Sequence, residues 1–342
     1  MNRISMVLAT ILCCFSVIFA QSGTTGPLTW SITDGTLTIS GAGAMPDYSQ
    51  SFYAIPRPPW MNYANLFSRV VIGDSVTMIG VDAFSRLENL TSIVIPNSVT
   101  TIGDMAFSGC RNLVELTIPN SVITIGIYTF AFTGLTEVII PNSVKTIGNN
   151  AFLYSTDLTS LTIGNSVTTI GNRAFRNCTG LTEVIIPNSV ITIGNSAFSG
   201  CTNLTSLTIG NSVTTIGSQA FAGCIGLTEV VIPNSVTTIE SAAFNRTGLM
   251  TITIPSSVTM MGNAFGGNPA LMSINVDIEN VAYSSENGVL FNKAKDRLVT
   301  YPAGKRGVYT IPNSVTTIGN LAFGGCRFNR GCYTKFSDEY WH

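Results

Sequence analysis

The side chains that most often carry out catalysis are scarce in this sequence. Its 342 residues include one histidine, His342, which is also the last residue. A single terminal histidine excludes the usual Ser-His-Asp and Cys-His arrangements and histidine metal sites, and the sequence has no glycine-rich phosphate loop. Glu137, Glu183 and Glu229 recur at one position of a repeat, but glycoside hydrolysis needs two close carboxyl groups in a cleft. We therefore expect a non-enzymatic protein without a cofactor or metal.

The cysteines follow a pattern of their own. Five of them lie three residues after a phenylalanine, namely Cys110, Cys178, Cys201, Cys224 and Cys326. This spacing predicts a column of cysteines on successive units and not the closely spaced pairs of a zinc site. Stacked strands lie about 4.8 Å apart, slightly beyond the usual Cβ separation in a disulfide, so we expect small buried free thiols. A bridge between Cys326 and Cys332 stays open.

A repeated template places these residues along the chain. It contains the dipeptide Ser-Val, whose valine falls at positions 76, 99, 122, 144, 167, 190, 213, 236, 258 and 315. The first nine valines are 22 or 23 residues apart. A period this short indicates a solenoid, in which each repeat forms one coil.

Each coil has one apolar side. In one copy the apolar positions are Leu181, Val184, Ile186, Val190, Ile193, Ala197 and Phe198. Seven such side chains do not outweigh an ordering entropy of about 1.5 kcal/mol per residue in a lone coil. Neighbouring coils must therefore stack, and stability must run along the stack.

The same copy predicts the local structure of a coil. Residues 181–186 indicate a short strand that ends at Pro187, and residues 190–193 indicate a second strand. Gly194 permits a turn, and Ala197 with Phe198 fits a tight helical turn whose ring fills the coil interior. We therefore expect a β-rich solenoid with short strands on two faces, tight helical turns and few regular helices.

The complete template resembles the BspA-like, Treponema-type leucine-rich repeats of bacterial surface proteins. The resemblance lies in a leucine, a branched apolar residue, Ile-Pro, then Val-Thr-Thr-Ile-Gly and Ala-Phe with cysteine, and it covers residues 70–326. It implies a right-handed leucine-rich-repeat solenoid. It also implies adhesion to host proteins or to other cells, and no catalytic residues.

A two-coil alternation predicts one candidate interaction surface. Leu-Thr-Glu copies alternate with Leu-Thr-Ser copies, so the glutamates should lie on one strand face beside outward side chains. The predicted surface comprises Glu137, Ile139, Thr162, Glu183, Ile185, Thr208, Glu229 and Val231. Duplication of the sequence by descent explains this alternation of copies equally well, because outward Thr, Ile and Val side chains simply suit a pleated surface. Adjacent threonine pairs, such as Thr168 and Thr169, raise the further alternative of a hydroxyl array for ice or crystalline polysaccharide.

The regular spacing breaks between Val258 and Val315, which indicates an insertion at about residues 280–308. Residues 288–292 and 298–302 predict a hairpin that projects from the stack. The insertion gathers Lys293, Lys295, Arg297, Lys305 and Arg306 against Asp296. These five basic residues are the second candidate surface, for an acidic polymer or cell surface. A solvated hairpin kept soluble by its charge is the alternative.

The sequence of the N-terminal segment predicts an export signal. Arg3 precedes an apolar run at residues 4–19, which is shorter than the roughly 20 residues of a spanning helix, so residues 1–20 are predicted to be a signal peptide. Residues 21–69 are predicted to form a β-hairpin, with its turn at Asp34-Gly35, and an aromatic, proline-rich cap. Its aromatic residues are Tyr48, Phe52, Tyr53, Trp60 and Tyr63, and a sugar-binding cluster is the alternative to the cap.

The composition of the chain limits the classes of partner that it is expected to bind. Only 10% of residues are charged and the net charge is −1, which does not suggest nucleic acid, and no other stretch of the mature chain is apolar enough to span a membrane. We expect a secreted or cell-surface protein whose partners are extracellular or host cell-surface proteins, with polysaccharide as the alternative. Residues 327–342 leave the template and are predicted to be a degenerate tail.

Overall fold

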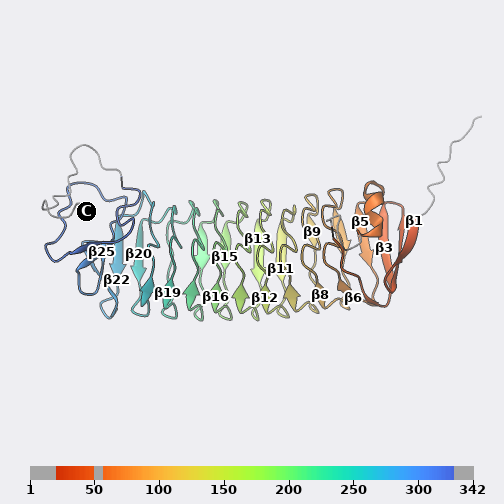
Figure 1. Ribbon diagram of the computed structural model, residues 1–342, viewed down its shortest axis with the longest axis horizontal. Coiled ribbons are helices and arrows are strands. Elements are labelled where there is room, and N and C mark those ends of the chain that lie inside the picture. The colour runs from red at the N-terminus through yellow and green to blue at the C-terminus, as the bar shows by residue number, and fades with distance from the viewer. Residues whose placement is uncertain (1–20, 50–56, 327–342) are drawn as a thin grey trace, which may run out of the picture.

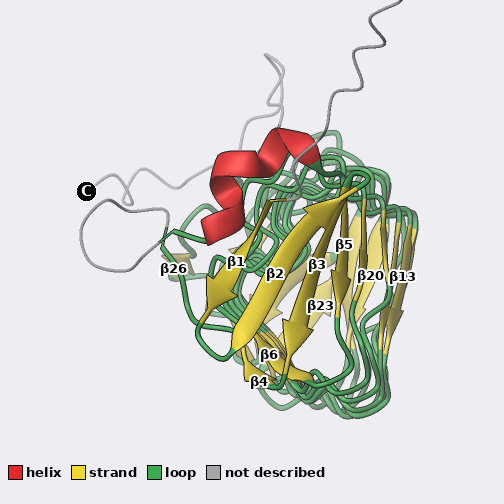
Figure 2. Cartoon of the chain, turned by 90° about the vertical axis from the view of Figure 1, so that its right-hand side faces the viewer, coloured by secondary structure: helices red, strands yellow, loops and turns green. Residues whose placement is uncertain are grey.

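A computed structural model describes residues 21–49 and 57–326 of the chain. The chain winds into an elongated stack of coils that begins at β1 and ends near β25 (Figure 1). Viewed along the stack, strands occupy two faces and turns close the coils between them (Figure 2). This arrangement confirms the predicted β-rich solenoid with strands on two faces.

The first face is a ten-stranded sheet in which all pairs are parallel. Its strands, in spatial order, are β21 (Met260–Met261), β19 (Thr238–Ile239), β18 (Thr215–Ile216), β16 (Thr192–Ile193), β14 (Thr169–Ile170), β12 (Thr146–Ile147), β10 (Thr124–Ile125), β8 (Thr101–Ile102), β6 (Val76–Ile79) and β4 (Gly43–Ala44). Threonine pairs with threonine and isoleucine with isoleucine from β8 to β19. The register is therefore set by the repeat, because equivalent positions of successive copies lie side by side.

The second face is divided into several sheets. A six-stranded sheet contains β1 (Gln21–Thr25), β2 (Leu28–Thr33), β3 (Thr36–Gly41), β5 (Arg69–Ile72), β7 (Ser92–Val94) and β9 (Glu115–Leu116). Three parallel pairs follow: β11 (Glu137–Ile140) with β13 (Ser160–Ile163), β15 (Glu183–Ile185) with β17 (Ser206–Thr208), and β20 (Thr251–Ile254) with β22 (Ser273–Val276).

The strands are shorter than the sequence predicts, because turns use the residues at their ends. The Val190 N–H donates to Pro187 O at 3.1 Å, and the Leu181 N–H donates to Cys178 O at 3.3 Å. Both bonds close turns, so the strands begin only after these residues.

The third side of each coil is a tight turn around the Ala-Phe pair. Hydrogen bonds between residues three apart in sequence close the turn, as in Cys178 N to Phe175 O at 3.3 Å. Phe175 N instead donates to Ala197 O of the next coil at 2.8 Å. Left-handed residues stand on both sides, with φ of 56° at Arg173 and 60° at Asn177. These residues keep the turn from continuing as a helix. In the described residues the one helix is η1 (Pro59–Leu66), a 3₁₀ helix.

A column of phenylalanine rings forms the centre of the core. The rings stack in chain order with centroids 5.1–5.9 Å apart: Phe84, Phe107, Phe130, Phe152, Phe175, Phe198, Phe221, Phe244 and Phe265. All are at most 1% exposed. Burial of each such side chain contributes about 1.5–3 kcal/mol, and each ring before Phe265 lies between two others, so the column couples the regular coils to their neighbours.

The N-terminal segment covers the first coil. Strands β2 and β3 form an antiparallel hairpin around Asp34 and Gly35, whose φ values of 49° and 72° suit a tight hairpin turn. Trp60 is fully buried and stacks on Phe84 at 5.6 Å, and Tyr48 is 2% exposed. Trp60 therefore extends the phenylalanine column and has no face for a sugar. Tyr63 packs against the same core, whereas Phe52 and Tyr53 lie outside the described residues.

The insertion forms a four-stranded sheet of β23 (Tyr283–Glu286), β24 (Val289–Asn292), β25 (Arg297–Thr300) and β26 (Thr317–Ile318). The predicted hairpin is present as β24 and β25, but the prediction that it projects from the stack is wrong. Val289, Leu290, Phe291 and Leu298 are at most 1% exposed, and Leu290 belongs to the main core. The hairpin packs onto the stack because it buries apolar residues on both of its faces.

The cysteine column is buried, as the sequence predicts. Cys110, Cys178, Cys201 and Cys224 are free thiols with no exposure, and each donates to a phenylalanine carbonyl oxygen 3.0–3.3 Å away. Cys326 is free and half-buried, and Cys332 lies outside the described residues. Burial raises the pKa of Cys110 and of Cys224 to about 12, so these thiols are unreactive.

Candidate interaction surfaces

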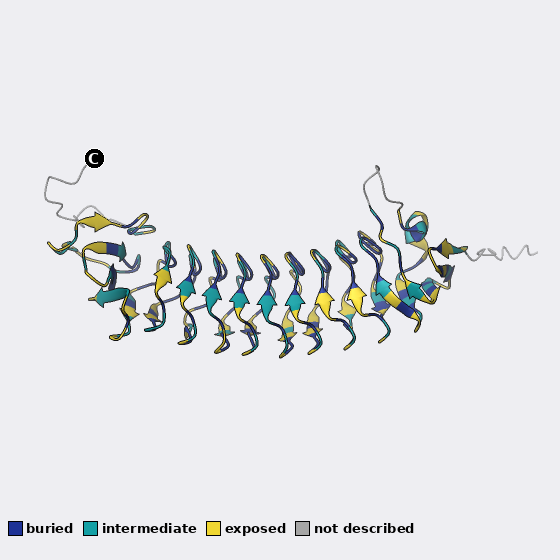
Figure 3. Ribbon diagram, turned by 60° about the horizontal axis from the view of Figure 1, so that its bottom comes forward, coloured by how far each residue is buried: buried dark blue, intermediate teal, exposed yellow. Residues whose placement is uncertain are grey.

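The predicted strand face carries a row of exposed side chains along the second face of the stack. We call Ile139, Thr162, Ile185, Thr208 and Val231 the outer row. Ile139 pairs with Thr162 and Ile185 pairs with Thr208 in the strand register. The aliphatic members are 57%, 55% and 82% exposed, in chain order, and both threonines are exposed. Figure 3 shows that the coils repeat side by side along the stack and carry intermediate or exposed residues on their strands. The outer row likewise runs over successive coils and so forms a broad surface.

The three predicted glutamates lie beside the outer row but do not form a carboxylate pair. Glu137 pairs with Ser160, and Glu183 pairs with Ser206, whose Oγ donates to Glu183 Oε1 at 3.3 Å. Glu229 is likewise exposed. A serine-bearing coil therefore separates successive glutamates. Within the described ranges no three His, Cys, Asp or Glu side chains are grouped so as to hold a metal ion.

The strand ladder is interrupted at the end of the outer row. Residues 228–233 form no strand, and a groove of about 610 Å³ lies between β17 and β20. Glu229, Val231 and Asp277 line this groove. Val231 is consequently the most exposed member of the outer row.

The threonine pairs do not form a continuous hydroxyl array. The hydroxyls of Thr100, Thr168 and Thr237 donate to carbonyl oxygens of the preceding coil at 3.2–3.4 Å. Exposed Ile123 and Ile191 stand in the same file of the stack. These threonine hydroxyls therefore form hydrogen bonds between neighbouring coils, and apolar residues interrupt their column.

Of the five basic residues of the insertion, Arg297 begins β25, two lie in the turn before it and two lie in the loop after it, and most of their charges are occupied. The Lys293 ammonium donates to Asn280 O, and the Lys305 ammonium donates to Asn287 O at 2.7 Å. Lys295 forms a salt bridge with Glu286 at 2.7 Å. The sequence interpretation counted Asp296 alone, whereas Glu286 also lies in this segment and Asp277 and Glu279 directly precede it. Arg297 and Arg306 are exposed and keep their charge for a partner.

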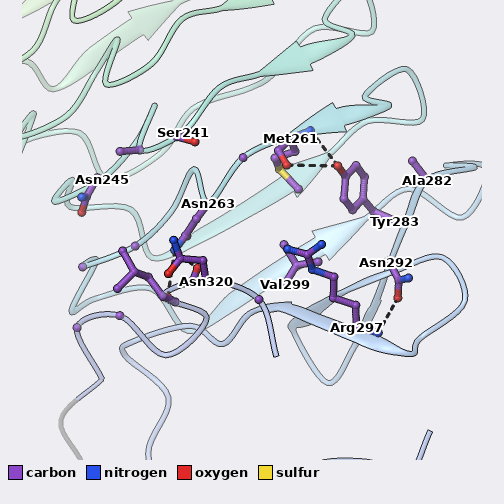
Figure 4. A pocket seen from close by; sticks show the side chains of 18 of the residues that line it. Ser241, Asn245, Met261, Asn263, Ala282, Tyr283, Asn292, Arg297, Val299 and Asn320 are labelled. Carbon is purple, nitrogen blue, oxygen red and sulfur yellow. Dashed lines mark hydrogen bonds between the residues drawn. The ribbon is translucent and has the colours of Figure 1, made fainter. Parts of the chain in front are cut away.

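A cleft that sequence reasoning missed lies where the insertion interrupts the stack. It has a volume of about 870 Å³ and lies between β21 and the last coil. Tyr283 and Arg297 extend into this region from β23 and β25, and Asn263 extends toward Asn320 (Figure 4). The 57-residue gap between Val258 and Val315 was the available signal, since a skipped coil leaves a space in a stack.

Comparison with protein families identifies the repeat. The sequence model of the family described as BspA type leucine rich repeat region matches residues 60–180 and 146–272, with six copies. The chain belongs to this family. BspA-type repeats therefore account for the regular coils, and the predicted family resemblance is confirmed. No curated protein matches the chain significantly.

Solved structures similar to this BspA-type protein are bacterial leucine-rich-repeat proteins. A leucine-rich repeat protein from Bacteroides ovatus is 21% identical, with a TM-score of 0.64, over 89% of this chain and 92% of that chain. A leucine rich cell surface protein from Faecalibacterium prausnitzii is 26% identical over 75% and 95%, with a TM-score of 0.38. The T. pallidum leucine-rich repeat protein is 25% identical over 60% and 91%, with a TM-score of 0.46. The first of these supports the fold.

The described part of this BspA-type protein contains no helix that could span a membrane. None of its helices has the length and apolar character that crossing a bilayer requires.

Proposed function

We propose that this BspA-type protein is a non-enzymatic, secreted or cell-surface protein that binds extracellular or host cell-surface proteins. The observation that carries the proposal is the outer row, in which three aliphatic side chains are more than half exposed and two of them, Ile139 and Ile185, are each in register with an exposed threonine of the next coil. Isolated exposed apolar residues are ordinary, but a repeated row of them on a rigid surface favours protein contact. The neighbouring glutamates add charge for orientation.

The basic residues of the insertion form a second, smaller part of the proposed surface. Arg306 is exposed, and Lys295 shares its charge with Glu286 across an exposed salt bridge that contributes little to stability. An acidic partner can therefore replace Glu286 as the partner of Lys295 with little loss of stability.

The proposed location follows from the apolar run at residues 4–19 after Arg3, which has the composition of an export signal. Fractionation of cells that express the full chain tests it. Export with loss of the first 20 residues is expected, and an intact chain in the cytoplasm contradicts it.

The alternative of a saccharide site at the N-terminal aromatic cluster is not favoured. Trp60 and Tyr48 are buried in the core, and neither ring is free to stack on a sugar.

Binding to immobilised extracellular-matrix proteins and to whole cells tests the outer row. The variant Ile139→Lys/Ile185→Lys/Val231→Lys places charges on the row without touching the core. Ile123→Lys/Ile191→Lys is the matched control, because these isoleucines are 52% and 48% exposed on the other strand face. Saturable binding that falls only in the outer-row variant supports the proposal. Equal loss in both variants, or none in either, contradicts it.

The variant Lys295→Gln/Arg306→Gln tests the insertion separately. Weaker binding to an acidic partner at low salt is expected. Unchanged binding removes the insertion from the proposed surface and leaves the outer row in place.

A further inference from the structure

The cleft beside β21 arises because the last coil meets the stack on one side only. On the turn side the two coils touch: Gly267 N donates to Gly324 O at 3.0 Å, and Asn263 Nδ2 donates to Asn320 O at 3.1 Å. On the strand side they separate, because β26 pairs with β25 and not with β21. The resulting wedge is a defined concavity, with a larger volume than the groove between β17 and β20.

The cleft wall carries positive charge without an acidic residue. Its lining includes Arg246 and Arg297 and contains no aspartate or glutamate. Neither arginine forms a salt bridge with a carboxylate among the described residues. Arg297 extends from β25 toward β21 (Figure 4). Two guanidinium groups without a carboxylate partner in the lining of one cleft favour an anion such as a carboxylate.

Amide groups make up much of the remaining wall. Asn245 and Asn263 line the cleft, and the Oδ1 atom of each is buried without a hydrogen-bond partner. A side chain at Gly267 would place its Cβ 2.7 Å from Asn245 Oδ1, so the glycine leaves space in front of this amide. Buried acceptors without donors are costly, and a ligand hydroxyl that reaches them after a small side-chain rotation removes that cost.

Tyr283 supplies an aromatic side chain in the same wall and closes the edge of β21. Its hydroxyl accepts from Met261 N at 2.8 Å, so this edge N–H is not open to an added peptide strand. The phenol also lies close enough to Arg297 for the guanidinium to oppose the rise in the pKa of Tyr283 that burial causes. The ring and the cation are thus next to each other.

We propose that this cleft binds a carboxylated saccharide. Arg297 pairs with the carboxylate, Arg246 adds positive charge to another part of the lining, the amides of Asn245 and Asn263 accept from the sugar hydroxyls, and the Tyr283 ring packs against an apolar sugar face. The polar, glycine-rich wall and the blocked edge of β21 favour a saccharide over a peptide. This site is separate from the outer row and does not depend on protein binding there.

Calorimetric titration with uronate and sialylated tetrasaccharides tests the site, with neutral tetrasaccharides of equal length as the comparison. Saturable binding of a carboxylated member, weakened by salt and absent for the neutral ones, is expected. Arg297→Gln should weaken it about tenfold or more, because a charge-assisted pair is lost. Arg173→Gln is the matched control, since Arg173 is exposed on a regular coil away from the cleft.

Three results overturn the proposal. They are no saturable binding to any carboxylated saccharide, equal binding of the neutral ones, and an Arg297→Gln variant that binds as well as the parent. The first result overturns it even if acidic peptides bind. Thermal unfolding of each variant shows whether it is folded, and Arg246→Gln provides an independent second variant at another position of the cleft lining.

Discussion

The hydroxyl of Tyr283 closes the open edge of the ten-stranded sheet by pairing with the backbone of Met261. The Met261 N–H donates to Tyr283 Oη at 2.8 Å, and Tyr283 Oη lies 3.4 Å from Met261 O, to which it donates. Because the insertion displaces the next coil, no strand from the described residues follows β21 in the sheet. One side chain therefore replaces a strand at the point where the repeat is interrupted.

Replacement of that hydroxyl should destabilise the C-terminal coils. Tyr283→Phe leaves a partly buried backbone N–H without its partner, and we expect a loss of about 1–2 kcal/mol in the free energy of unfolding. Urea unfolding followed by circular dichroism measures it. Tyr154→Phe is the control, because Tyr154 is 44% exposed and its ring stacks on Phe132 through carbon atoms. Equal stability of the two variants contradicts the edge-closing role.

Removal of one ring from the phenylalanine column should uncouple the two halves of the stack. Phe198 stacks on Phe175 at 5.2 Å and on Phe221 at 5.5 Å. Phe198→Ala should cost about 3–5 kcal/mol and should separate the urea transition into two steps, because coils contact only their neighbours. Phe132→Ala, in a surface pair, should cost about 1 kcal/mol and keep one transition. A single unshifted transition for Phe198→Ala contradicts the coupling.

The regular coils could be predicted from the sequence because each coil meets the same surroundings. All seven apolar positions of the copy from Leu181 to Phe198 are at most 1% exposed. In a solenoid, residues one period apart become neighbours, so the local pattern already contains the tertiary contacts. The exposed positions of the outer row followed from the same alternation.

The irregular end of the stack could not be predicted in the same way. Asn263 bonds to Asn320 and Leu321 across the insertion, a contact that no period indicates. The packed position of β24 did have a signal, since Val289, Leu290 and Phe291 are consecutive apolar residues and not an alternating strand. Such a run is typical of a strand that is buried on both faces.

Left-handed turn positions also escaped prediction, because ordinary residues occupy many of them. Arg173 has a φ of 56° and an exposed side chain. Arg173→Gly should stabilise the protein by about 0.5 kcal/mol, as relief of the left-handed strain slightly exceeds the entropy cost of glycine. Thermal unfolding measures the gain. Arg111→Gly, at an exposed position without a positive φ, should lower the melting temperature, and a fall in both variants argues against strain at Arg173.

The buried cysteines should make the protein less stable as pH rises above about 9. Burial raises the pKa of Cys224 from 9.0 to about 12 and that of Cys110 to about 12, and it raises the pKa of Cys201 as well. The folded state therefore holds these protons at pH values where the unfolded chain has lost them. Stability is complete below pH 9 and is lost progressively between about pH 9 and 12, by at most about 1.4 kcal/mol per pH unit for each thiol.

Urea unfolding between pH 7 and pH 10.5, under reducing conditions, measures this slope. Cys224→Ala should lose some stability at pH 7 through the cavity it creates, but its stability should fall less steeply above pH 9 than that of the parent. Cys326→Ala should change the slope less, because Cys326 is half-buried and its pKa is raised only to about 11. If Cys224→Ala and the parent have parallel profiles, the Cys224 thiol keeps no proton through burial, and the alkaline loss belongs to other groups such as Tyr48, whose pKa burial raises to about 12.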